Sequence, residues 1–302
     1  MLKRFKTSIL FSLISMLGMQ TLYSQRFFEN ADSLHKPRLI TVSTLTVTGW
    51  AGSMAGLHYV WYKDYPKSKF HFFNDSKEWL QMDKAGHFFT AYHISHKIAG
   101  AFRWSGLNRN LSCAIGAGVG FGYQLTLEFL DGQNAQWGFS WSDLAANSLG
   151  TAFYVAQELA FREQIFKPKF SFYPSKYAKY RPNTLGSNFA EQLFKDYNGQ
   201  TYWISFSPFA FSKNERLPKW LCLSLGYSID AKLHGDLNIY QAGGETFYAK
   251  RQFVLSLDID VSKIPFKKKW PKVLLSPFNL IKIPFPAVIF TSDGVSGRWI
   301  YF

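Results

Sequence analysis

Beyond the first 25 residues, two long stretches of this sequence contain no Lys, Arg, Asp or Glu, and they constrain the fold more than any other feature. The first is residues 39–62, LITVSTLTVTGWAGSMAGLHYVWY, and the second is residues 110–127. An uncharged segment of about 20 residues either spans a bilayer or forms a helix buried in protein. The Thr and Ser content of residues 39–62 makes that stretch a weak membrane span. We expect a helix in each stretch.

Residues 83–102 and 142–161 also have helical spacing of apolar side chains, which brings the total to about four helices. We predict that they form a helical, membrane-associated domain over residues 37–165. Glycines recur at four-residue spacing, at Gly52 and Gly56 and within IGAGVGFG at residues 115–122. This spacing favours close helix packing. A phosphate-binding loop is excluded because no Gly-Lys-Ser/Thr follows.

The second half of the chain has a period closer to two. The segments TYWISFSPFAF, KWLCLSLGYSID and RQFVLSLDIDV alternate in polarity or are rich in β-branched and aromatic residues. We predict a basic, aromatic linker over residues 166–200 and a β-rich region over residues 201–302. Pro284 and Pro286 indicate that residues 279–290 form an edge strand or an extended arm. The expected fold class is α+β, with an apolar helical bundle first.

The N-terminus indicates export. Residues 1–25 begin with Lys3, Arg4 and Lys6, continue with a largely apolar run, and offer Ser24 as a small residue before Gln25. This is the layout of a secretory signal peptide, and a retained membrane anchor is the alternative. Export makes a nucleic-acid partner improbable, so the net charge of +14 is assigned to anionic lipid or to solvation. An aromatic content of 19% also suits a membrane interface.

We therefore expect an exported protein of the cell envelope, at the outer membrane or periplasmic face rather than the inner membrane. Cys113 and Cys222 lie in different predicted elements, and their spacing favours two buried thiols over a disulfide. No cysteine follows the predicted signal peptide, which argues against lipidation at that point.

Three of the predicted helices carry a polar stripe near one end. The stripes contain Asp83 and His87, then Gln124 and Glu128, then Asp143, Asn147, Gly150 and Tyr154. The short connection at residues 130–140 joins the end of one such helix to the start of the next. If residue 83 begins its helix at the same level, one cluster forms.

Such a cluster has two readings, which the sequence leaves open. His87, Glu128 and Asp143 have the donor types of a metal site, and His87 could equally act as a base oriented by a carboxylate. Alternatively the cluster is structural, with carboxylates at helix starts, Asn147 bridging backbones and Lys84 paired with Glu128 or Asp131. Ionisable residues within apolar helices lean towards function when a membrane surrounds them.

The remaining histidines of the helical half are weaker candidates for site residues. His58 lies late in the first uncharged stretch, where it could join the cluster but is more simply an interfacial polar tip. His93, His96 and Lys97 are interpreted as a face towards solvent or lipid head groups.

The order DKAGHF, LEFLDG and FSWSDLAANSLG resembles the YfiM-like family of uncharacterised bacterial envelope proteins, which carry a domain of unknown function numbered 2279. It is more weakly similar to the VanZ-like helical membrane proteins. The resemblance covers residues 83–150 and implies a compact helical envelope domain. Its motif residues are Asp83, Lys84, His87, Glu128, Asp131, Asp143 and Asn147. The chain differs from lipoprotein members by lacking the lipidated cysteine and by carrying a β-rich second half.

The expected function is that of an exported, membrane-associated envelope protein whose polar cluster serves structure or binds a ligand or metal. The alternative is a membrane-embedded hydrolase or transferase acting on lipid or cell-wall precursors. Membrane lipid or another envelope protein is the expected partner. The sequence leaves the cofactor, the substrate and any enzymatic activity undetermined.

Overall fold

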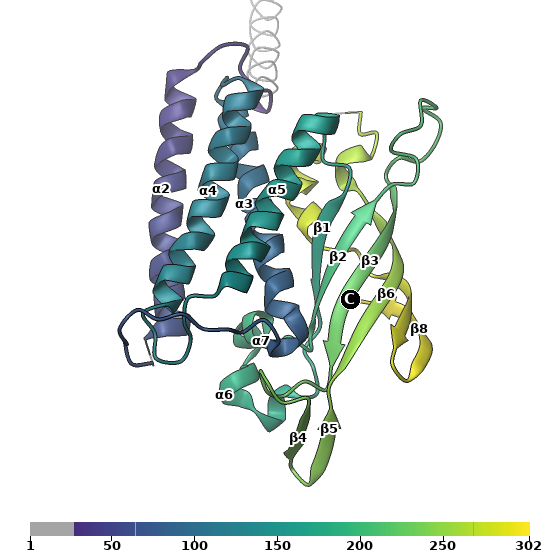
Figure 1. The fold of residues 1–302 in the computed structure, drawn as a ribbon. Coiled ribbons are helices and arrows are strands. Elements are labelled where there is room, and N and C mark those ends of the chain that lie inside the picture. The colour runs from purple at the N-terminus through teal and green to yellow at the C-terminus, as the bar shows by residue number, and fades with distance from the viewer. Residues whose placement is uncertain (1–26, 64, 268) are drawn as a thin grey trace, which may run out of the picture.

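The computed structural model describes residues 27–63, 65–267 and 269–302, so the predicted signal peptide at residues 1–25 lies outside the described residues. Helices come first and a mainly antiparallel sheet follows, which confirms the predicted α+β class (Figure 1). The α-helices are α2 (Lys36–Leu57), α3 (Met82–Trp104), α4 (Arg109–Asp131), α5 (Trp141–Phe161), α6 (Pro182–Leu185), α7 (Phe189–Lys195) and α8 (Lys269–Leu275). The strands are β1 (Lys167–Phe172), β2 (Gln200–Phe206), β3 (Leu221–Asp230), β4 (Ile239–Ala242), β5 (Glu245–Tyr248), β6 (Lys250–Ile259), β7 (Phe285–Thr291) and β8 (Gly294–Tyr301).

Helix α3 is the centre of the helical layer, with α4 and α5 packed against it and the sheet beside it (Figure 1). Helix α2 lies at the outer edge of the bundle and continues into a π-helical turn at His58–Tyr62. Val42 is the one buried residue of α2, so the alternative of a helix fully buried in protein is wrong for this part of residues 39–62. None of the described helices combines the length and apolarity that crossing a membrane requires.

Glycine spacing sets how closely α3 and α4 approach, but only on one stripe of α4. A Cβ atom added at Gly120 would lie 2.9 Å from the carbonyl oxygen of Ala91, and one at Gly116 would lie 2.7 Å from the Cβ of Ala99. Gly118 has no described atom within 4 Å of such a Cβ. The same holds for Gly52 and Gly56 of α2, so the predicted close packing at that pair is wrong.

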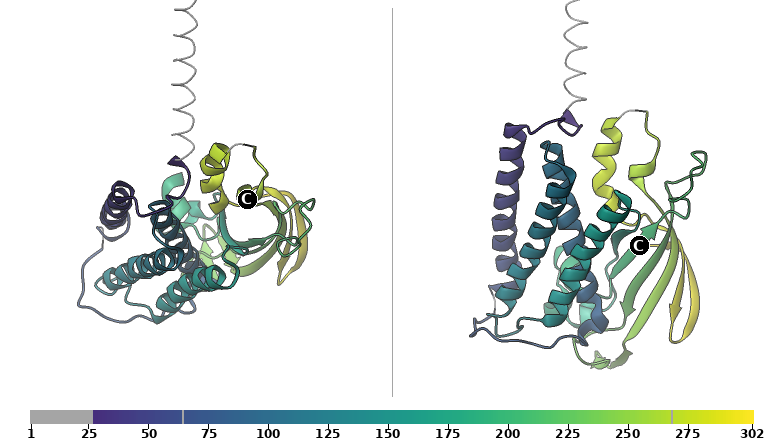
Figure 2. Two further views of the ribbon diagram at one scale, coloured as in Figure 1. Left: turned by 90° about the horizontal axis from the view of Figure 1, so that it is seen from above. Right: turned by 45° about the horizontal axis from the view of Figure 1, so that its top comes forward.

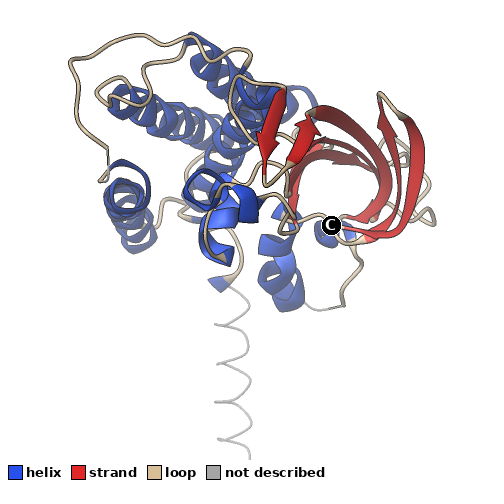
Figure 3. Ribbon diagram, turned by 90° about the horizontal axis from the view of Figure 1, so that it is seen from below, coloured by secondary structure: helices blue, strands red, loops and turns tan. Residues whose placement is uncertain are grey.

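The larger sheet has the strand order β1-β2-β3-β6-β7-β8, with every neighbouring pair antiparallel. It is strongly curved, as the view from below shows (Figure 3). Its first strand, β1, lies inside residues 166–200, the segment that was predicted as a linker. Strand β1 begins Lys-Pro-Lys, a composition that hides it among the basic residues around it.

Strands β1 and β2 attach the sheet to α3. The Phe89 ring of α3 lies 6.1 Å from the ring of Phe170 and 5.7 Å from that of Tyr202. The Nε2 atom of His93 lies 2.8 Å from the carbonyl oxygen of Pro168, at the start of β1. His93 is therefore buried, and its predicted exposure to solvent or head groups is wrong. The sheet covers that face of α3 and leaves Lys97 exposed.

Strand β7 is internal to the sheet, contrary to the prediction of an edge strand. Its pairing with β8 shifts in register between Phe285 and Ala287, at Pro286. Proline lacks an amide hydrogen, and a bulge is a place where a sheet tolerates that loss. The bulge explains why two prolines did not exclude β7 from the sheet interior.

The concave side of the sheet encloses a polar core. Lys169 and Asp258 are fully buried there, with 2.7 Å between Nζ and Oδ2. The Oγ of Ser205 donates to the same Asp258 carboxylate at 2.8 Å, and Trp203 packs beside them. Such groups are tolerated in a dry interior because they bond to one another.

A left-handed turn leads into α3. Trp79, Leu80 and Gln81 have φ values of 45°, 52° and 66°, a conformation that costs side-chain-bearing residues about 1–2 kcal/mol each. Residues in or next to the sheet stabilise this turn through hydrogen bonds. The amide of Trp79 donates to the carbonyl of Gly235 at 2.9 Å, and Arg251 donates to the side chain of Gln81 at 2.6 Å. The hydroxyl of Tyr227 donates to the carbonyl of Leu80.

Both cysteines are free and buried, which confirms the prediction of two ordinary thiols.

The glycine contacts predict opposite effects of one substitution at two positions of α4. Gly120→Ala places a methyl group against the α3 backbone and should destabilise the protein by about 2 kcal/mol. Gly118→Ala adds a methyl in open space and should stabilise it by up to about 1 kcal/mol through helix propensity. Unfolding curves of both variants measure this difference. Equal effects would show that α3 and α4 are not in close contact.

Candidate functional site

The polar residues gather at one end of the bundle, where α3 and α5 begin and α4 ends. This antiparallel arrangement brings Asp83, Glu128 and Asp143 to one level although they lie far apart in the sequence. Ser140 caps α5 by accepting a hydrogen bond from the Asp143 amide at 3.1 Å, and so fixes where that helix starts. A cavity of about 840 Å³ opens beside this end of the bundle.

Lys84 lies at the centre of a carboxylate cage. Its Nζ is 2.7 Å from Asp75 Oδ2, 2.8 Å from Asp83 Oδ2 and 2.8 Å from Asp143 Oδ1. The predicted pairing of Lys84 with Glu128 or Asp131 is therefore wrong. The loop before α3 returns to the bundle end and supplies Asp75, a nearer partner.

Asp75 is not among the predicted site residues. It lies in the segment FNDSKEW at residues 73–79, whose Asn, Asp and Ser are typical of any turn. Its Oδ1 accepts hydrogen bonds from the hydroxyls of Ser140 at 2.5 Å and Ser142 at 2.7 Å. Asp75 thus ties the loop to the start of α5, a contact that no local pattern signals.

The cage stabilises its own charges. Burial disfavours the charge on Lys84, but the carboxylates of Asp83 and Asp143 outweigh burial and raise the pKa of its ammonium above the ordinary value. Burial also acts on Asp75, yet hydrogen bonds from its neighbours and from Lys84 lower its pKa to about 2. This part of the cluster is a closed ionic network.

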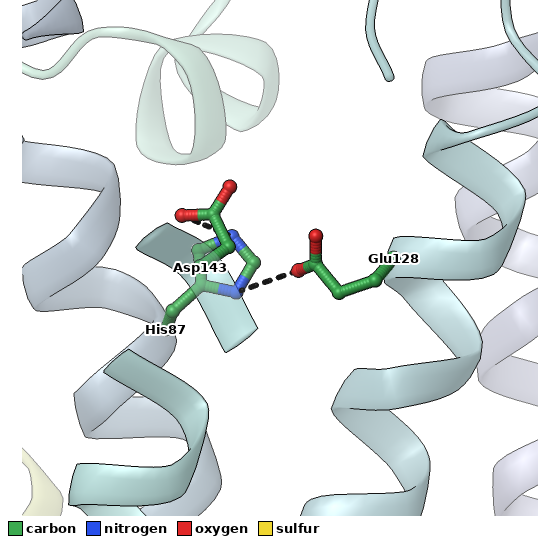
Figure 4. Close-up of side chains that lie close together, drawn as sticks. All are labelled: His87, Glu128 and Asp143. Carbon is green, nitrogen blue, oxygen red and sulfur yellow. Dashed lines mark ion pairs between the residues drawn. The ribbon is translucent and has the colours of Figure 1, made fainter. Parts of the chain in front are cut away.

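His87 stands between two carboxylates, one at each ring nitrogen (Figure 4). Its Nδ1 lies 3.6 Å from Glu128 Oε1, and its Nε2 lies 3.7 Å from Asp143 Oδ1. Nδ1 is also 3.1 Å from Asn147 Oδ1, an atom that can only accept. The amide nitrogen of Gln124 also lies 3.3 Å from Nδ1, and Nε2 faces Asp143.

A second layer of amides holds this arrangement. Asn147 Nδ2 donates to Glu128 Oε1 at 3.3 Å, and Gln124 Nε2 donates to Asn147 Oδ1 at 2.8 Å. Asn147, Glu128 and Gln124 are all buried. His87, Asp143 and Gln124 line the cavity, so one side of the histidine is fixed and the other opens on it.

Burial and neighbouring charges together raise the pKa values of Glu128, Asp143 and His87. Burial raises the pKa of Glu128 to about 8 and that of Asp143 to about 6, although His87 opposes both shifts. Burial lowers the pKa of His87, but Asp143 and Glu128 outweigh it, so the net shift is upward. Groups that titrate near neutral pH are those suited to proton transfer.

A metal ion has two candidate positions among the described residues. One ligand atom each from His87, Glu128 and Asp143 lie within 4.8 Å of one another, and the same holds for Asp75, Asp83 and Asp143. At the first position the carboxylates flank different nitrogens of the ring, so an ion bound at one nitrogen has one carboxylate across the ring from it. At the second position the Lys84 ammonium already stands among the oxygens. The geometry fits proton transfer at Nε2 better than either ion.

Two predicted residues lie apart from the cluster. The carboxylate of Asp131 accepts a hydrogen bond from the Tyr62 hydroxyl at 2.7 Å, and burial raises its pKa to about 6. His58 is exposed and stacks on the Tyr62 ring at 6.5 Å, so it does not join the site.

The rest of the cavity wall is strongly aromatic. Its rings include Tyr62, Phe73, Trp79, Phe89, Tyr123, Trp137, Phe170, Tyr197 and Tyr202. Arg181 and His234 add basic side chains contributed from outside the helical bundle. The side-chain carbonyl of Gln124 is buried at the polar end without a hydrogen-bond partner among the described residues.

Comparison with known proteins supports the class of a helical domain of an exported envelope protein. Residues 71–158 match the family model described as predicted periplasmic lipoprotein, DUF2279. The match confirms the resemblance to the YfiM-like family for this segment, and it confirms the expected exported location in the cell envelope. It lends no support to the VanZ-like similarity. Curated proteins and solved structures gave no significant match.

The carboxylate cage predicts that a divalent cation can replace the lysine. Lys84→Ala leaves three carboxylates facing one another and should destabilise the protein by about 3 kcal/mol. Addition of Ca²⁺ should restore part of that loss, because oxygen ligands of this kind bind hard cations. Thermal unfolding with and without Ca²⁺ measures the rescue. The double variant Lys84→Ala/Asp75→Asn, with one carboxylate fewer, should show less rescue.

The raised pKa values predict that stability falls as pH rises from about 4.5 to about 8. In this window the folded protein binds protons at Glu128 and Asp143 that the unfolded chain has released. Glu128→Gln removes one of these groups and should flatten the pH dependence by on the order of 3 kcal/mol across the window. Denaturant unfolding at several pH values tests this. An unchanged slope would show that Glu128 is ionised throughout.

Proposed function

We propose that this exported envelope protein is membrane-associated and binds the polar end of an amphiphilic envelope molecule beside His87. The observation that carries the proposal is the two-sided lining of the 840 Å³ cavity. Aromatic rings form a large part of its wall, while His87, Asp143 and Gln124 form a polar end. A cavity of this size that joins apolar rings to polar side chains is typical of ligand sites.

Charge at the polar end favours a hydrogen-bond donor in the ligand. Two basic side chains, Lys84 and His87, lie among four carboxyl groups, those of Asp75, Asp83, Glu128 and Asp143. Acidic groups therefore outnumber basic groups in the cluster. The buried carbonyl of Gln124 adds an acceptor that lacks a donor. A hydroxyl or an amine meets both conditions.

Basic side chains elsewhere in the same cavity favour a second, anionic group. Arg181 and Lys195 line it together with the acidic side chains of Glu78 and Asp236, and Arg181 also donates to the carbonyl of Leu233 at 2.8 Å. A molecule with an amine or hydroxyl next to a phosphate and an acyl chain matches the acidic, basic and aromatic parts of the wall. Envelope phospholipids and cell-wall lipid precursors have this chemistry.

A second candidate function is an acid–base hydrolase or transferase acting on the same molecules. The specific observation in its favour is the His87 ring, with Nδ1 fixed by Asn147 and Nε2 beside Asp143 at the cavity. In such an enzyme Nε2 accepts a proton from water or a hydroxyl as that oxygen attacks the substrate. It then returns the proton to the leaving group, and Asp143 stabilises the imidazolium between these steps.

Binding of lysophosphatidylethanolamine to the purified protein tests the proposal. Trp79 and Trp137 line the cavity, so tryptophan fluorescence should change on titration. His87→Gln should weaken binding about tenfold or more, because it removes the imidazole that lines the cavity. The matched control is His96→Gln, on the same helix but outside the cavity, which should leave the affinity unchanged.

The same experiment separates the two candidates. Mass spectrometry of the incubated lipid shows whether the bound molecule is converted. Conversion that is lost in His87→Gln establishes the enzyme, whereas binding of intact lipid establishes the carrier or receptor. Equal affinity of both histidine variants, or a titration without any fluorescence change, would contradict the assigned site.

A further inference from the structure

The outward face of the large sheet is apolar and exposed. Strand register places Tyr227, Phe253, Phe290 and Val295 in one row across β3, β6, β7 and β8. Phe253 is 57% exposed, Phe290 42% and Val295 67%. Leu225, Leu257 and Val288 on the same face are exposed as well. We call the exposed members the outer apolar face; it consists of Leu225, Phe253, Leu257, Val288, Phe290 and Val295.

The opposite face of the same strands is buried and mixes polar with apolar side chains. Its inward positions include Ser224, Ser256 and Asp258, and Val254 packs there with Trp203 and Ile289. The outward neighbours Leu225 and Leu257 are exposed. A sheet with one face in water normally has polar residues on that face. Apolar residues in those positions indicate that the surroundings of the outer apolar face are themselves apolar.

A single protein partner does not account for the full extent of this exposure. Helix α2 exposes Ile40, Leu45 and Val47, each more than half accessible, and lies across the helical layer from the sheet (Figure 2). Apolar surface therefore occurs on both sides of the molecule. One docked protein covers one side, whereas a bilayer surrounds a protein embedded in it.

Basic residues lie beyond the apolar strand segments. Lys213 and Arg216 are exposed in the loop that precedes β3, near the end where β6 finishes. Arg251 is exposed at the other end, where β6 begins. The whole chain has a net charge of +14. Anionic lipid head groups attract such residues, while the acyl chains suit the leucine and phenylalanine side chains between them.

We infer that the outer apolar face is the surface through which this protein contacts the acyl chains of an anionic lipid bilayer. The inference rests on the membrane association proposed above and assigns it to particular strands. The inference also places the cavity near a bilayer, which supplies amphiphilic molecules. Strands β1 and β2, which pack on α3, belong to the same sheet as the outer apolar face.

Flotation with vesicles of phosphatidylethanolamine and phosphatidylglycerol tests the inference on the full chain. The double variant Phe253→Gln/Phe290→Gln changes two cross-strand neighbours. Its affinity for vesicles should fall by about tenfold or more. The matched control is Ile239→Gln in β4, which is 58% exposed but belongs to the small β4–β5 sheet. It should bind as the unchanged protein does. Both variants replace exposed side chains, so circular dichroism should show the native fold.

Each alternative outcome has its own meaning. If the unchanged protein floats and the double variant floats equally well, membrane association stands and the assigned surface is wrong. If the unchanged protein does not float, the proposed membrane association fails together with the surface. If the lipid-free protein is a dimer that Phe253→Gln/Phe290→Gln dissociates, the face is an interface between copies and the inference is overturned.

Discussion

The arrangement of the site depends on one buried ammonium group. Lys84 holds carboxylates from the preceding loop, from its own helix and from α5, and no two of these would lie so close without it. Because Asp75 also accepts bonds from Ser140 and Ser142, the loop, α3 and α5 share one junction. That junction sets Asp143 beside His87. The ionic network is thus the support for the histidine, and the two readings left open by the sequence describe adjoining parts of one cluster.

The helical half was largely predictable because its signals are local. Helical spacing and the capping residues around Ser140 located α5 to within a residue, and placed His87, Glu128 and Asp143 at one end of the bundle, where they do lie. The partner of Lys84 was not predictable, since Asp75 reaches it through a long loop. The family resemblance pointed to the same segment, and the match at residues 71–158 covers it.

The sheet was harder to predict because apolar residues occupy exposed positions in β3 and β6. Reading apolar positions as buried would turn β3 and β6 inside out, since Leu225 and Leu257 face outwards while Asp258 is buried. Strand β1 was hidden by its lysines, and Lys169 is one of the most deeply buried side chains of the molecule. Pairwise contacts such as Lys169 with Asp258 exist only after strands from distant parts of the chain have met. A single sequence carries no direct record of them.

The left-handed turn at Trp79–Gln81 limits how far the helical segment is self-sufficient. The turn sets the direction in which α3 begins, and hence where Lys84 and His87 lie, but its stabilising bonds come from Tyr227, Gly235 and Arg251. All three lie outside residues 71–158. Grafting that segment alone onto another scaffold would transfer the site residues without the hydrogen bonds that fix the start of α3. A portable version of the site has to include β3, the loop that carries Gly235 and the start of β6.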